Sequence, residues 1–435
     1  MSQAVTAAPD YAGQFAAWSR AVPLPASLAD LRRDAFNTFE QLGFPTTRLE
    51  EWRFTNVALI AEVPFVVPEG DPSLSRESLE ELHLPRLGGA ELVFVNGRLA
   101  PGLSSTTGLP DGVRVVGLAE AITGEVAGRV GQLASVGGQA FTALNTAFLG
   151  DGAVVEVDDG VVAETPIHLL FVTSPGAAPV LSQPRVVVSA GANSQVRIVE
   201  SHAGGGETEY LSNAVTEVWA ADNAVVDHYS VVREADNGFH VGQLVAQLGR
   251  ASNFSSHAIT LGGAIVRNEA RVVLGGEGGE CTLNGLYLGT GRQLVDNQTT
   301  IDHAMPHCDS HELYKGILDG RSRAVFNGKI VVRLDAQKTD AKQSNKALLL
   351  SEDAQVTTKP QLEIFADDVK CTHGATVGQL DEDALFYLRS RALSEEQARQ
   401  LLIHAFAADL LGHIKLDAIR EQLDALLLER LPVAG

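Results

Sequence analysis

Cysteine, aromatic residues and positive charge are all scarce in this chain of 435 residues, which has three cysteines, 6% aromatic residues and a formal net charge of −21. Cys281, Cys308 and Cys371 are too few and too widely spaced for a disulfide framework, and none belongs to a CxxC pair. An acidic surface of this kind repels phosphate backbones and anionic lipids. We therefore expect neither nucleic acid nor a membrane among the partners.

Several other sequence features are missing as well. No apolar run approaches the length of roughly 20 residues that a membrane-spanning helix needs. The first 15 residues contain neither the basic nor the apolar segment of a secretory signal. Together with the unpaired cysteines, this predicts a cytoplasmic protein with reduced thiols. No phosphate-binding loop of the GxxxxGK[ST] type occurs, because Gly328 and Lys329 precede Ile330, which has no hydroxyl for Mg²⁺.

The abundant residues are glycine, with 42 copies, valine and alanine, and they favour β-structure with many tight turns. Six short segments, each a small polar turn leading into a strand, begin at residues 191, 221, 250, 277, 321 and 352. Their offsets are 30, 29, 27, 44 and 31 residues. A period near thirty without intervening helices predicts a β-solenoid over residues 91–377, with one long insertion in the 44-residue interval. A β-sandwich is the alternative, and it would show no such repeat.

Helical patterns flank this region. In residues 1–90, Ser27 is a candidate N-cap of a helix that Gly43 and Pro45 end. In residues 378–435, Asp381 can cap one helix, and Ser394 with Gln397 forms a capping box for the next. That second helix carries an apolar stripe of Leu402, Phe406, Leu410 and Leu411. The stripe predicts either a cover for the open end of the solenoid or a docking surface for a partner.

The densest group of metal-binding residue types is His303, His307, Cys308 and His311. On a helix, His303 and His307 would share a face, as in zinc sites; on a continuous strand all three histidines would point one way, although Pro306 interrupts either arrangement. The two interpretations are a metal-dependent enzyme using His303, His307 and His311, and histidines that serve the turns and interior of the solenoid. A carbohydrate-active solenoid using Asp319, Arg321 and Arg323 is a further alternative, although few aromatic residues are available to stack on sugars.

The stretch DDVKCTHGAT, residues 367–376, holds Cys371 and His373 where the predicted solenoid ends. Both side chains bind soft or borderline metals, and on a strand they would project to the same side. One cysteine and one histidine cannot complete a metal site. The alternative is a buried thiol beside a hydrogen-bonded histidine.

Residues 338–407 resemble the SufB/SufD family of the SUF iron–sulfur cluster assembly system, and more specifically its SufD branch. The similarity rests on TKPQLEIFADDVKC with HGATVG, on LFYLRSR, and upstream on DHAMPHCDSHELYKGIL, LNTAFLGDGAVVEV and RLEEWRFTN. It covers most of the chain and is loosest between residues 60 and 140. The sister protein SufB has an acidic EHEAT-type motif at the position of CTHGAT, which favours SufD.

The resemblance implies a right-handed parallel β-helix core between helical regions. It also implies pairing with SufB, edge to edge through the end of the β-helix, and binding of the SufC ATPase through the C-terminal helices. No ATPase or desulfurase activity is expected in this chain. Iron or a nascent iron–sulfur cluster would gather transiently at the SufB–SufD interface, with none tightly bound by the isolated chain. By this resemblance the metal residues are His373 and Cys371, whereas Cys281 and Cys308 are expected to be structural. A homodimer is plausible when SufB is absent.

One position departs from the family pattern. The family usually reads RSRG, whereas this chain has Ala392 after Arg391. Glycine suits a left-handed helix C-terminus, and alanine in that conformation costs about 1 kcal/mol.

Overall fold

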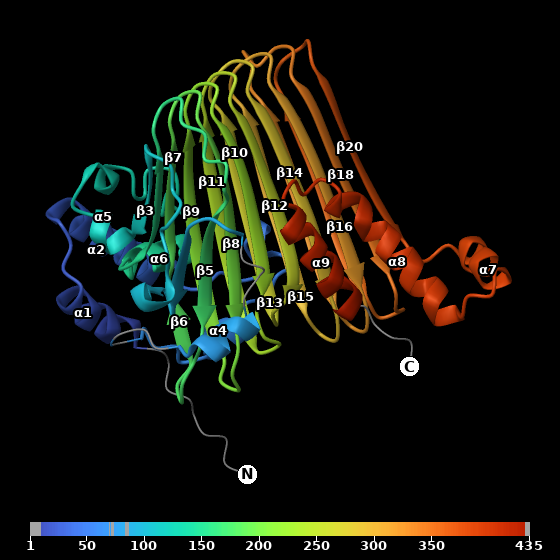
Figure 1. Ribbon diagram of the computed structural model, residues 1–435, viewed down its shortest axis with the longest axis horizontal. Helices are drawn as coiled ribbons and strands as arrows, with labels where there is room; N and C mark the ends of the chain where they lie inside the picture. Colours follow the sequence, from blue (N-terminus) through green and yellow to red (C-terminus); the bar gives the residue numbers. More distant parts are fainter. Residues whose placement is uncertain (1–9, 69, 71–73, 83–86, 431–435) are drawn as a thin grey trace.

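The computed structural model describes residues 10–68, 70, 74–82 and 87–430 (Figure 1). It confirms a mainly β architecture in which a parallel β-solenoid lies between N-terminal and C-terminal helices, and it excludes a β-sandwich. Among the helices of these segments, none combines the length and hydrophobicity of a bilayer span.

The strands form two long sheets that face each other. The first sheet, in spatial order, contains β2 (Arg98–Leu99), β1 (Glu91–Val95), β5 (Ile167–Thr173), β8 (Gln195–Gly204), β10 (Val225–Arg233), β12 (Asn253–Gly262), β14 (Glu280–Gly289), β16 (Asp309–Leu318), β18 (Asp340–Leu349) and β20 (Lys370–Gly378). The second contains β19 (Gln355–Ile364), β17 (Arg323–Val332), β15 (Leu294–His303), β13 (Ile265–Leu274), β11 (Gly238–Leu248), β9 (Tyr210–Ala220), β7 (Arg185–Ala190), β4 (Gly152–Val157) and β3 (Val113–Gly117), and β6 (Val180–Ser182) pairs with β9.

Each coil contributes one strand to each sheet, and the core lies between the sheets. Val196, Leu244, Val272 and Phe326 are among the apolar side chains that meet there, and all are buried. Because side chains alternate along a strand, the other half of each strand faces outward and is covered by helices or solvent.

A repeated turn precedes most strands of the first sheet. One residue in each turn has a positive φ between 49° and 72°: Asn193, Asn223, Ala251, Gly278, His307 and Lys338. The backbone N–H of each donates to a carbonyl in the next turn, as Asn193 does to Asp222 and His307 to Gln337. These positions recur every 27 to 31 residues without interruption.

The uninterrupted repeat shows that the insertion predicted within the 44-residue interval does not exist. The segment beginning at residue 277 leads into β14 of the first sheet, whereas the one beginning at residue 321 leads into β17 of the second. The turn between them, at His307, lies between Pro306 and Cys308 and has none of the small polar residues that identify the other turns. The 44-residue interval therefore runs from a turn before the first sheet to a turn before the second sheet, and it does not measure the repeat.

The N-terminal helices pack on the outer face of the second sheet, where Phe36, Phe39 and Phe141 meet Leu211 and Val241. They are α1 (Tyr11–Ala21), α2 (Ala26–Leu42), α3 (Ala58–Glu62), α5 (Leu118–Ala121) and α6 (Ala140–Ala147), with short 3-10 turns at Glu50–Trp52, Pro101–Leu103 and Glu125–Gly128. Helix α4 (Arg76–Leu82) packs instead on the first sheet, where Leu79 meets Val93 of β1 and Leu170 of β5.

The ends of helix α2 test the expected signals at residues 27 and 43. The residue at its N-cap is Pro25 and not Ser27, because the helix already begins at Ala26 and no side chain caps it. Gly43 ends the helix with φ 61°, as expected.

The C-terminal helices are α7 (Glu382–Ser390), α8 (Glu395–Leu411) and α9 (Asp417–Arg430). The capping by Asp381 and the capping box of Ser394 and Gln397 are confirmed. Ala392 has φ 70°, so the departure from glycine does place alanine in the left-handed region.

The interpretation of the tail as a cover for the open end was wrong. Leu410 and Leu411 are buried against Val231, Leu288 and other outward-facing residues of the first sheet. Helices α8 and α9 therefore lie on the flank of the solenoid, while α7 projects away from it (Figure 1). A stripe on a helix shows that one face is buried but not which surface buries it.

The turn repeat predicts the effect of Ala251→Gly. Ala251 is exposed and has φ 49°, so glycine relieves steric strain without removing a packed side chain. We expect the free energy of unfolding to rise by about 1 kcal/mol, measured by chemical denaturation. The matched control, Ala270→Gly in the middle of β13, should lower it. A loss of stability in Ala251→Gly would show that the turn is not strained.

Candidate functional site

The last strand of the first sheet, β20, carries Cys371 and His373. Cys371 lies opposite Ala341 of β18, and His373 lies opposite Gln343. Ala341 and Gln343 are buried and face the interior. Since parallel neighbours in register point their side chains the same way, Cys371 and His373 both belong to the inner side of the final coil, as their spacing predicts.

The two residues have different surroundings. Cys371 is half-buried against the apolar cluster of Ile330, Val332 and Ala341, and this burial raises the pKa of its thiol. A raised pKa disfavours the thiolate that metals bind. His373 is exposed. Across the described part of the chain, no group of three or more His, Cys, Asp or Glu side chains could hold a metal ion, so these two residues offer at most part of a site.

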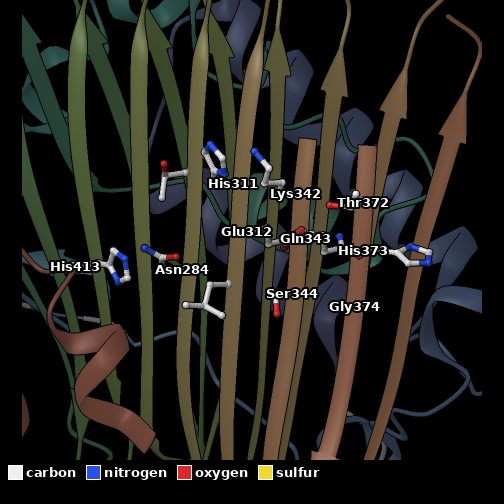
Figure 2. A pocket seen from close by; sticks show the side chains of 12 residues that line it. Asn284, His311, Glu312, Lys342, Gln343, Ser344, Thr372, His373, Gly374 and His413 are labelled. Carbon is white, nitrogen blue, oxygen red and sulfur yellow. Dashed lines mark hydrogen bonds between the residues drawn. The ribbon is translucent and has the colours of Figure 1, made fainter. Parts of the chain in front are cut away.

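A surface cavity of about 620 Å³ lies over this end of the sheet (Figure 2). Most of the residues that line it are of polar types, including His311, Lys342, Thr372, His373 and His413. Figure 2 shows Glu312, Gln343 and His373 in a row across successive strands. The row joins the exposed histidine to two residues that are each 3% exposed.

Glu312 is the strongest electrostatic feature of this row. Burial raises the pKa of its carboxyl to about 7, although the hydrogen bond from Gln343 opposes the shift. Gln343 Nε2 donates to Glu312 Oε2 at 2.6 Å, while Glu312 Oε1 has no hydrogen-bond partner among the described residues. Sequence analysis missed both residues. No sequence signal marked them, because the turn at His307, which precedes β16, lacks the small polar residues of the other turns.

The structure disperses the histidine group that suggested a metal-dependent enzyme. His303 is buried at the end of β15, with Nε2 2.9 Å from Ser310 Oγ. His307 is the left-handed residue of a turn, and His311 is exposed on the outer side of β16. The chain is not a continuous strand through these residues, because β15 ends at His303 and β16 begins only at Asp309, so the condition under which all three histidines would point one way is not met.

The remaining candidates have structural surroundings. Cys281 and Cys308 are 1% and 0% exposed, and burial raises the pKa of both thiols, in keeping with the structural roles expected for them. Arg321 forms an exposed ion pair with Asp353 at 3.3 Å, and the hydroxyl of Ser351 donates to Asp319. Asp319 and Arg321 are thus polar turn residues.

Comparisons with known proteins agree with the geometry. The profile of the family described as SUF system FeS cluster assembly, SufBD core domain, matches residues 171–406, and that of the SufBD protein N-terminal region matches residues 19–169. An iron–sulfur cluster assembly SufBD family protein of Synechocystis is 36% identical, covering 91% of this chain and 89% of that protein. The iron–sulfur cluster assembly protein SufD of Escherichia coli is 31% identical, with 90% of each chain covered. A chloroplastic Arabidopsis protein, ABCI7, is 30% identical over 91% of this chain and 84% of its own length.

The buried carboxyl predicts a pH-dependent effect of Glu312→Gln. An unfolded glutamate has a pKa near 4.5, whereas the folded value is about 7, so the folded state binds the extra proton between these values. The wild type therefore loses stability as the pH rises through this window. Glutamine cannot ionise, so Glu312→Gln should gain about 3 kcal/mol relative to wild type between pH 4.5 and pH 8.

Unfolding midpoints of both proteins at pH 5 and pH 8 would measure this gain. The exposed Glu352→Gln serves as the control and should shift the midpoint equally at both pH values. If Glu312→Gln also shifts it equally, the carboxyl is not ionising in a buried site.

Proposed function

Because this chain belongs to the SufB/SufD family of the SUF iron–sulfur cluster assembly system, we propose that it is a non-catalytic scaffold subunit of the assembly complex. In this proposal it pairs with SufB, binds the SufC ATPase, and contributes to iron acquisition and cluster assembly at the SufB–SufD interface. The observation that carries the proposal is that the solenoid ends in two uncovered strands, one of which presents His373.

The uncovered strands are suited to pairing with a second solenoid. β19 and β20 each have one hydrogen-bonded neighbour, β17 and β18, among the described strands. Their side chains are mostly exposed or half-buried, whereas those of the preceding strands are mostly buried. A partner with the same architecture could continue both ladders and cover the final coil. A second copy of this chain could do so when SufB is absent.

Iron enters this proposal as a substrate that the interface receives. A neutral imidazole such as His373 suits Fe²⁺, and iron–sulfur clusters need about four ligands that are mostly thiolates. Cys371 and His373 would supply two at most, so the partner strand would supply the rest. A site divided in this way can release its cluster when the two chains move apart.

The SufC-binding surface is assigned to α7. Its Phe386 and Tyr387 side chains are 75% and 57% exposed, while Leu385 is buried. Leu401, on the adjoining helix α8, is 48% exposed. Aromatic residues grouped on a projecting helix are typical of interface hot spots.

Replacement of His373 tests the iron site. The chain would be co-expressed with SufB and SufC and purified anaerobically as wild type, His373→Ala and His311→Ala. We expect His373→Ala to assemble normally but to lose most of its iron and acid-labile sulfide, because the imidazole is a ligand. The His311→Ala control removes a second exposed imidazole from the same cavity and should leave loading unchanged.

Normal iron loading in His373→Ala would remove this residue from the mechanism. Loss of loading only in His311→Ala would instead favour the metal-dependent alternative. Failure of the partners to co-purify with the wild type would contradict the scaffold role.

Replacement of the α7 aromatic residues tests the docking surface. The double variant Phe386→Ser with Tyr387→Ser should weaken SufC binding at least about 30-fold, because two exposed hot-spot side chains are lost. SufB pairing should persist, because α7 follows the end of β20 and projects away from the solenoid, and it contributes no residue to the hydrogen-bonded edges of β19 and β20 (Figure 1). Binding would be measured by titration of purified SufC. Leu59→Ser, which changes an equally exposed apolar residue on α3, should have no effect; an equal loss there would mean that α7 is not the specific contact.

A further inference from the structure

The row of Glu312, Gln343 and His373 is set by the register of the sheet. Glu312 of β16 pairs with Gln343 of β18, and Gln343 pairs with His373 of β20. Adjacent strands are about 4.8 Å apart, so each residue lies beside the next. All three occupy inner positions, and only His373, on the final strand, is exposed.

The hydrogen bond to Glu312 fixes the orientation of the Gln343 amide. Gln343 Nε2 donates to Glu312 Oε2 at 2.6 Å. With the amide nitrogen facing Glu312, the amide oxygen of Gln343 faces elsewhere. That oxygen is buried and has no hydrogen-bond partner among the described residues. A buried acceptor without a donor is costly, and most such groups in proteins find one.

The neighbouring imidazole is a donor of the right kind. His373 is the residue opposite Gln343, and its ring carries an N–H in either neutral tautomer. In the isolated chain the imidazole remains exposed. A partner that covers the final coil would confine the ring to the space above Gln343.

We propose that Gln343, held by Glu312, is a positioning residue for His373: its amide oxygen accepts the imidazole N–H and leaves the other ring nitrogen for iron. This inference rests on the proposed function of His373. Metal-binding histidines generally donate their second N–H to a carboxylate or carbonyl, which fixes the tautomer and raises the basicity of the ligand. Glu312 accepts from the amide nitrogen and so holds the amide in this orientation.

The test measures Fe²⁺ affinity of the anaerobic complex with SufB and SufC, using Fe²⁺ alone as the probe. Gln343→Leu keeps the volume but removes the amide, and it should weaken the His373-dependent binding about 10-fold to 100-fold. The matched control is Asn345→Leu. Asn345 is on the same strand, is 1% exposed, and also has a buried oxygen without a partner, but it lies opposite Ala375. Its replacement should leave the affinity unchanged.

A variant that exchanges the two residues tests the proposed hydrogen bond between His373 and residue 343 even if Gln343→Leu does not assemble. Glu312→Gln combined with Gln343→Glu retains an amide–carboxylate pair and places the carboxylate beside His373. The exchange should bind Fe²⁺ at least as tightly as wild type. Affinity reduced as far as in His373→Ala would overturn the proposal, because a correctly placed acceptor would then have no effect.

Two failures can be told apart. If His373→Ala leaves Fe²⁺ binding unchanged, the proposed function itself is wrong. If His373→Ala weakens Fe²⁺ binding but Gln343→Leu does not, then His373 acts without Gln343. The same holds if Asn345→Leu weakens binding as much as Gln343→Leu does. In both cases only the proposed positioning of His373 by Gln343 is wrong.

Discussion

The hydrogen-bond ladder between successive coils is the constraint on which the rest of this structure depends. Each parallel strand satisfies its backbone groups only through the coils on either side, so the ladder must be closed or continued at both ends. At the start, short antiparallel strands close it: β2 pairs with β1, and β3 pairs with β4. At the other end, β19 and β20 have no such closure among the described residues. Because of this asymmetry, the open end of the ladder is the coil that carries Cys371 and His373.

The ladder also explains how much of the fold can be predicted from sequence. The period is visible because most left-handed turn positions hold, or lie beside, small polar residues, as at Asn193, Asn223 and Gly278. Where His307 occupies that position the period disappears, since histidine between proline and cysteine gives no turn signal. Helix caps at Asp381 and Ser394 are local and were predictable. The surface that buries the apolar stripe of α8 is remote in sequence and was therefore not predictable.

The candidate site also has one part that was predictable from sequence and one part that was not. Cys371 and His373 were found because a short family motif contains both. Glu312 and Gln343 are 61 and 30 residues away from His373, and only the exact register of three strands brings them together. An error of one residue in that register would turn every side chain to the other face. Local patterns do not determine register to that accuracy, so the buried part of the site required the structure.

The position of the C-terminal helices restricts how a docked ATPase could act on this site. Lys315 of β16 is buried, and its ammonium donates to Asp409 at 2.5 Å and to the Phe406 carbonyl at 3.0 Å, both on α8. Separating α8 from the sheet would break these two hydrogen bonds and would expose Leu410, Leu411 and the outward-facing apolar residues that they cover to water. Peeling of α8 is therefore disfavoured, and the solenoid with α8 and α9 should move as one body. In the proposed complex, a force applied at α7 would then tilt the open edge that carries Cys371 and His373, and would not unfold the tail.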